Sequence, residues 1–165
     1  MDTYLSGTGK EQEFTAVYEM YVDDIYRLCF SFMKNHMDAE DAVQETFLKY
    51  YYSEKHFHTE QHLKAWLIVT ASNYCKDLLK QSFRKQKNID DFKEIAGEEE
   101  PHIDEIMEMV MNLPEKHKTA VYLYYYEGYN SREIARLLHK PDSTIRTYLQ
   151  KARKILKQEI SEKKE

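Results

Sequence analysis

Three long stretches of the sequence carry apolar side chains at spacings of three and four residues, the pattern of an amphipathic helix. The first runs from about Glu11 to Lys34, the second follows Asp38, and the third begins near Leu63. Glycine and proline number 4 and 3 among 165 residues, so the chain lacks the many turn residues that a β-sandwich or barrel requires. We therefore predict an all-α fold.

The start of the second helix is marked by acidic residues. Asp38, Glu40 and Asp41 place carboxylates next to free backbone amides and the positive end of the helix dipole, so we expect Asp38 to be the N-cap. From Tyr52 to Gln61 the apolar periodicity is lost. This stretch is expected to form a loop before the third helix.

The middle of the chain has the composition of a linker. From Gln86 to about Pro101 no apolar stripe is present, and Asn88 to Glu108 carries nine acidic residues against Lys93, a net charge of −8. Such a segment buries too little apolar surface to offset the entropy lost on ordering. We predict two small helical domains, residues 10–86 and 102–160, joined by a flexible acidic linker at residues 87–101.

The second domain contains a helix-turn-helix pattern. A short helix is expected to stop at Leu113-Pro114, and a second is expected from Glu115 to Glu127 with Gly128 as its C-terminal cap. Asn130 and Glu133 then have the spacing of a capping box. A break at residues 139–142 separates the helix that they begin from a final helix, and two helices joined by a tight turn indicate a helix-turn-helix.

The final helix has two different faces. Its apolar residues fall on one side: Ile145, Leu149, Ala152 and Leu156. A separate sector holds side chains that can bond to bases or phosphates: Ser143, Arg146, Thr147, Gln150 and Lys154. The alternative is a basic amphipathic helix that only closes a bundle, but cap, turn and polar face coincide and favour a DNA-reading helix.

Net charge alone gives an ambiguous answer about partners. The chain carries 24 basic and 29 acidic residues, a net charge of −5. The basic residues are nevertheless concentrated, with a net of +4 from Tyr74 to Lys87 and +6 from Ser131 to Gln158. These segments are compatible with nucleic-acid binding and equally with ordinary solvated helix faces.

Cysteine usage and hydropathy favour a soluble cytoplasmic protein. Cys29 and Cys75 lie in apolar periodic stretches without metal-ligand spacing, so we expect two buried free thiols in a reducing compartment. The longest stretch without charged residues, Ala65 to Cys75, is far shorter than the roughly 20 residues of a membrane span. The polar N-terminus does not resemble a signal peptide.

The sequence contains no complete set of catalytic or metal-binding residues of the kind that an enzyme requires. His56, His58 and His62 lie close in sequence, but no carboxylate or cysteine completes a metal or catalytic set. No phosphate-binding loop, nucleophile elbow or zinc-protease motif is present. We expect no enzymatic activity, metal, cofactor or small-molecule substrate.

Several motifs, in order along the chain, resemble the extracytoplasmic-function (ECF) group of bacterial RNA polymerase sigma factors. Asp38-Ala-Glu-Asp-Ala-Val-Gln-Glu-Thr-Phe47 resembles conserved region 2.2, and His62-Leu-Lys-Ala-Trp-Leu67 with Asn73 and Asp77-Leu-Leu-Lys80 resembles the end of region 2. Leu113-Pro-Glu-Lys, Asn130-Ser-Arg-Glu-Ile-Ala135 and Thr144-Ile-Arg-Thr-Tyr-Leu-Gln-Lys-Ala-Arg153 resemble region 4.

The resemblance implies how the protein acts. Such factors join core RNA polymerase, give it promoter specificity and initiate transcription, here of a stress or envelope-response regulon under the control of an anti-sigma factor. The polymerase contacts would be the β′ clamp helices and the β flap. The residues implied in core binding are Asp38, Glu40, Asp41, Gln44 and Glu45.

The resemblance also assigns two DNA-binding surfaces. For the melted minus-ten element it implies Lys55, His56, Phe57, Asn73, Lys76, Lys80 and Arg84. For the minus-thirty-five duplex it implies Ser143, Thr144, Arg146, Thr147, Gln150, Lys151 and Lys154. His139 stands where the family usually has glycine, so we expect a left-handed backbone there. The rival interpretation is a stand-alone helix-turn-helix regulator, which leaves Asp38 to Phe47 unexplained.

Overall fold

The computed structural model describes residues 8–86 and 105–164, and within these ranges it contains helices and connecting turns without strands. This confirms the all-α prediction. In chain order the helices are α2 (Thr8–Met33), α3 (His36–Tyr52), α4 (Glu60–Gln86), α5 (Glu105–Met111), α6 (Glu115–Tyr125), α7 (Ser131–Leu138) and α8 (Asp142–Lys164). The expected acidic linker, residues 87–101, lies outside the described residues.

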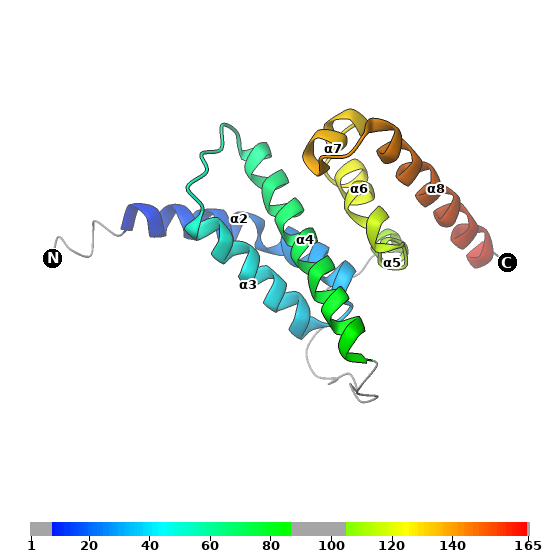
Figure 1. Cartoon of the computed structure of the whole chain (residues 1–165), viewed down its shortest axis with the longest axis horizontal. Coiled ribbons are helices and arrows are strands. Elements are labelled where there is room, and N and C mark those ends of the chain that lie inside the picture. The colour runs from blue at the N-terminus through cyan, green and yellow to red at the C-terminus, as the bar shows by residue number, and fades with distance from the viewer. Residues whose placement is uncertain (1–7, 87–104, 165) are drawn as a thin grey trace.

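Helices α2, α3 and α4 form an N-terminal bundle (Figure 1). Its core contains Ile25, Phe32, Phe47 and Leu67, each at most 2% exposed. Cys29 and Cys75 are fully buried free thiols, as the sequence predicts, and a hydrogen bond with Cys75 together with burial raises the pKa of Cys29. The apolar stripes of the three helices therefore meet in one core.

The start of α3 corrects one prediction. The N-cap is Asn35, whose side-chain oxygen accepts a hydrogen bond from the Asp38 amide at 2.9 Å, and the helix begins at His36. Lys34, with φ of 60°, ends α2 and turns the chain so that Asn35 is extended. Asp38 is therefore a first-turn residue, where its carboxylate still favours the helix dipole.

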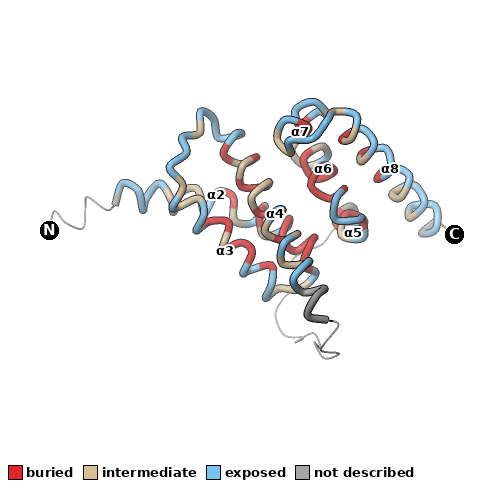
Figure 2. The backbone as a smooth tube through the Cα atoms, in the orientation of Figure 1, coloured by how far each residue is buried: buried red, intermediate tan, exposed pale blue. Residues whose placement is uncertain are grey.

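Helices α5 to α8 form a C-terminal bundle, in which α6 and α7 both pack against α8. Ile134, Ile145 and Ala152 are fully buried between them. Figure 2 shows buried segments along α6 and at the meeting of α2, α3 and α4, whereas the outer side of α8 is exposed. The helix-turn-helix is thus supported from behind by an apolar core and open on its outer side.

The end of α6 differs from the sequence prediction. The helix stops at Tyr125 with Tyr126 as C-cap, before Glu127, and Gly128 has φ of 74° in the turn that follows. The Tyr129 amide then donates to the Leu123 carbonyl at 3.1 Å. Earlier termination lets the chain reverse and bring Tyr129 into the core, where it is 7% exposed.

The helix-turn-helix has the local geometry expected from its sequence. Asn130 and Glu133 form both bonds of the capping box, at 2.9 and 3.1 Å. His139 has φ of 53° and ψ of 45°, the left-handed conformation expected at this position. In the described part of the chain, no helix is long and apolar enough to span a membrane.

Candidate functional site

The outer face of α8 presents the polar side chains that the sequence assigns to duplex DNA. Thr144 is half-buried. The other six side chains are exposed: Ser143, Arg146, Thr147, Gln150, Lys151 and Lys154. The opposite face packs Ile145, Leu149 and Ala152 against α6 and α7, while Leu156 is half-buried. One side of the helix is therefore fixed and the other is available to a groove.

Contacts within α8 orient some of these polar side chains and leave them accessible to solvent. Arg146 Nε lies 3.5 Å from Asp142 Oδ2, one turn earlier, and the Arg146 side chain is 67% exposed. The Thr147 hydroxyl donates to the Ser143 carbonyl at 2.9 Å. Behind the helix, the His117 ring packs on Tyr148 at 5.1 Å, and burial followed by the charges of nearby lysines lowers the pKa of His117. The buried His117 ring thus supports α8 from α6.

The polar side chains predicted to bind polymerase, four acidic and one amide, lie on α3. Asp38, Glu40, Asp41 and Gln44 are exposed and Glu45 is half-buried. Two of them have local partners: Asp38 accepts from Asn35 Nδ2 at 2.9 Å, and Glu40 lies 3.0 Å from His36 Nε2. The side chains of Asp41 and Gln44 share one helix face at a spacing of three residues.

The predicted minus-ten residues do not form a single uniform surface. Lys55, His56, Asn73 and Lys80 are exposed. Phe57 is half-buried, with its ring 5.6 Å from Trp66 and 6.4 Å from Tyr50. Its aromatic face is therefore partly taken up by packing in this structure.

Two further basic residues of the predicted minus-ten set belong to α4. The Lys76 side chain is half-buried, and burial together with the nearby charge of Lys140 lowers its pKa. The Arg84 side chain lies outside the described part of the structure. Among the residues described, no three His, Cys, Asp or Glu side chains gather as metal ligands, so His56, His58 and His62 are not placed around a common point.

The structure also brings together polar residues that the sequence analysis missed. Lys64 Nζ on α4 lies 2.9 Å from Asp24 Oδ2 and 3.0 Å from Glu127 Oε1. Burial alone would lower the pKa of Lys64, but the two carboxylates outweigh it and the pKa is raised. No local sequence pattern pairs Lys64 with Glu127, because they belong to different bundles.

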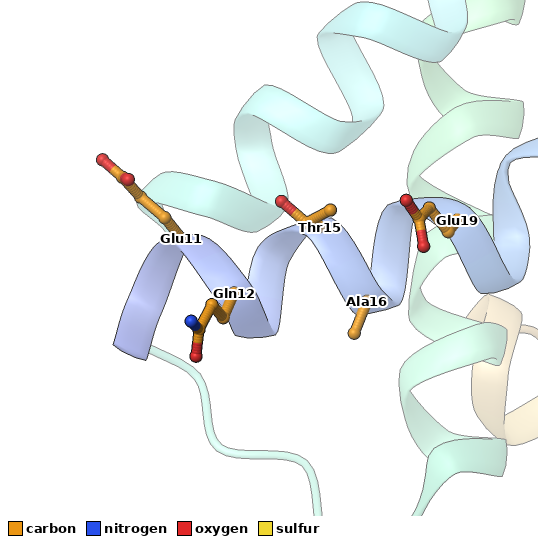
Figure 3. A pocket seen from close by; sticks show the side chains of 5 residues that line it. All are labelled: Glu11, Gln12, Thr15, Ala16 and Glu19. Atoms are coloured by element: carbon orange, nitrogen blue, oxygen red, sulfur yellow. The ribbon is translucent and has the colours of Figure 1, made fainter. Parts of the chain in front are cut away.

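A shallow depression on α2 provides no additional site. It is lined by Glu11, Gln12, Thr15, Ala16 and Glu19, all of which belong to α2 (Figure 3). With walls from one helix only, this depression has no convergent groups from other elements to enclose a small ligand.

Comparisons with known proteins identify both halves of the chain. Residues 17–87 match the family described as Sigma-70 region 2, and residues 103–156 match Sigma-70, region 4. The chain is 30% identical over 151 residues to the ECF RNA polymerase sigma factor SigM of Bacillus subtilis, covering 86% of this chain and 91% of that protein. It is 25% identical to SigW of the same organism, covering 92% and 91%.

A solved structure has the same fold. The sigma factor RpoE of Bartonella quintana, crystallised with the anti-sigma factor NepR, superposes with a TM-score of 0.72 at 20% identity, covering 91% of this chain and 98% of that one. The two domain matches, the curated relatives and the shared all-helical fold agree. The chain belongs to the extracytoplasmic-function group of the sigma-70 family of RNA polymerase sigma factors.

Proposed function

We propose that this sigma factor binds core RNA polymerase through α3, melted minus-ten DNA through α4 and the loop before it, and minus-thirty-five duplex through α8. The observation that carries the proposal is α8 itself, which exposes Arg146, Thr147 and Gln150 on the side opposite its buried apolar residues. Arginine and glutamine form the paired hydrogen bonds that distinguish guanine and adenine edges. We assign residues 10–86 and 102–160 to the two functional domains.

Core binding is assigned to the acidic face of α3, which would dock on the β′ clamp helices, while the C-terminal domain would meet the β flap. Asp41→Lys reverses an exposed charge on this face and should abolish co-purification with core polymerase without unfolding the protein. Glu19→Lys, an equal reversal at an exposed position of α2, is the matched control. Normal co-purification of Asp41→Lys would refute the assignment of this face.

Promoter recognition is tested by run-off transcription. Purified core polymerase and the protein are incubated with a library of genomic fragments, and the transcription start sites are mapped. We expect starts that share a two-part upstream motif. No protein-dependent starts from a folded sample would instead favour a stand-alone regulator, which binds its site in a gel shift without core polymerase.

We also propose control by a protein partner. RpoE of Bartonella quintana was crystallised with the anti-sigma factor NepR, and this supports, by analogy, an anti-sigma factor that holds the present protein inactive until a stress or envelope signal. The protein would act in the cytoplasm, with bond formation left to the polymerase and no metal, cofactor or substrate of its own. Affinity capture from cells before and after stress tests whether such a partner binds the protein. The captured partner is then added to the transcription assay, where it should inhibit initiation.

A further inference from the structure

The two bundles are joined by a specific set of polar contacts. Three side chains of the C-terminal bundle donate to backbone carbonyls of the N-terminal bundle: Lys118 Nζ to Ser31 at 2.6 Å, Tyr122 Oη to Asp24 at 3.3 Å and Tyr129 Oη to Gln61 at 3.2 Å. All three donors are at most 7% exposed. Buried donors with matched acceptors indicate a built interface and not a loose collision of domains.

Lys118 occupies the end of α2. The Ser31 carbonyl belongs to the last turn of that helix, where carbonyls have no partner further along the helix and the dipole is negative. The Lys118 ammonium also lies 5.2 Å from the centre of the Phe32 ring. A cation is favoured by both features, so Lys118 acts as a C-terminal cap supplied by the other bundle.

Lys64 adds an ion triad at the edge of the interface. It links Asp24 of its own bundle with Glu127 of the C-terminal bundle, and the three side chains are between 13% and 30% exposed. Partial burial reduces screening of such a network by salt. The triad therefore connects α2 and α4 with the turn that follows α6.

This contact is incompatible with occupation of both promoter elements. It packs α6 and α7 against α4, and it leaves Lys76, assigned above to minus-ten DNA, half-buried near Lys140. Elements centred near minus ten and minus thirty-five lie roughly 25 base pairs apart, about 85 Å along B-form DNA at 3.4 Å per base pair. Two bundles in direct contact do not span that distance.

We propose that the interface is an autoinhibitory latch: Lys118 capping α2, together with the Lys64 triad and the Tyr122 and Tyr129 hydroxyls, holds the free protein closed until polymerase and promoter separate the bundles. The inference rests on the proposed function. The exposed Asp41 and Gln44 on α3 leave the assigned polymerase surface available in the closed state. Polymerase can therefore engage the closed protein before the latch opens.

Zero-length cross-linking of the full-length protein measures whether the two bundles are in contact. A water-soluble carbodiimide adds to a carboxylate to give an O-acylisourea. The neutral lysine amine attacks the acyl carbon, forming the amide and releasing the reagent as its urea. In the free protein we expect both Asp24–Lys64 and Lys64–Glu127 amides by peptide mass spectrometry, because both pairs lie within 3.0 Å. With core polymerase and promoter DNA, the Lys64–Glu127 product should disappear while the product within the N-terminal bundle remains.

Two variants test whether closure inhibits initiation. Tyr122→Phe/Tyr129→Phe removes only the two hydroxyls, and Glu127→Arg repels Lys64; each should increase promoter-dependent transcripts several-fold at limiting protein. The double variant should also lower the yield of the Lys64–Glu127 amide. Glu19→Arg, at an exposed position of α2, makes the same charge change as Glu127→Arg and should leave transcription at the wild-type level.

The proposal is overturned if the free protein yields no Lys64–Glu127 amide, if the promoter complex retains it, or if neither variant raises transcription. Failure of the proposed function looks different. In that case the wild-type protein gives no promoter-dependent transcripts with core polymerase. Transcripts that require the wild-type protein but do not increase in the variants refute the latch alone.

Discussion

Removing the Arg146 side chain should weaken recognition of the minus-thirty-five element. The residue stands on the exposed face of α8, and its contact with Asp142 is long and solvated, at 3.5 Å with 67% exposure. Release of such a pair costs at most about 0.5 kcal/mol. A paired contact with a guanine contributes about 1–3 kcal/mol, so Arg146→Ala should weaken binding by about 5- to 150-fold.

The assay is binding of the polymerase holoenzyme to the mapped promoter and to promoters substituted at each minus-thirty-five base pair, repeated over a series of salt concentrations. If Arg146 reads a base, the variant loses discrimination at one base pair. Lys157→Ala, an exposed residue three turns further along α8, is the matched control and should keep wild-type discrimination.

Two results would refute the reasoning about Arg146. A uniform loss of affinity on all promoters, with a salt slope reduced by about 1, would make Arg146 a phosphate contact. Unchanged affinity and selectivity would remove it from the interface. The first outcome keeps α8 as the DNA-binding helix, whereas the second also contradicts the orientation assigned to its exposed face.

Three further predictions concern local structure and are read by chemical denaturation. Asn130→Ala breaks the capping box and should lower the free energy of unfolding by about 1 kcal/mol; no change would show that the cap is not stabilising. His139→Gly relieves a left-handed backbone and should raise stability by up to about 1 kcal/mol; a loss would mean that the His139 side chain contributes more than the strain. Burial, followed by the charge of Lys34, lowers the pKa of Lys118 to about 8 from 10.5, against the opposing effects of Glu115 and Cys75. The unfolded chain therefore binds more protons between these values, and stability should rise with pH from about 8 to 10.5 in the wild type relative to Lys118→Met; parallel pH profiles would contradict the low pKa.

Much of the fold was predictable because it depends on local patterns. The stripes that produce α2, α3 and α4, the capping box at Asn130 and Glu133, and the left-handed His139 are set by residues within a few positions of one another. The exposed face of α8 follows equally from helical spacing. The candidate DNA-reading residues of that helix were therefore accessible from the sequence, although their roles in binding remain predictions.

Helix ends were less accessible, because competing caps lie only two or three residues apart. Asn35 and Asp38 are both good N-cap residues, and the left-handed Lys34 decides in favour of Asn35. At the end of α6, burial of Tyr129 moves termination ahead of Gly128. Such choices depend on where the chain must go next.

The contact between the bundles is decided by tertiary structure alone. Lys118 meets the Ser31 carbonyl across 87 residues of sequence, and Lys64 meets Glu127 only because α4 packs beside α6 and α7. Periodicity reports which side of a helix is apolar, and it contains no information about which distant carbonyl or carboxylate a buried lysine will reach. The sequence by itself therefore determined the helices, the helix-turn-helix and the family, whereas the closed arrangement follows from how the two finished bundles fit together.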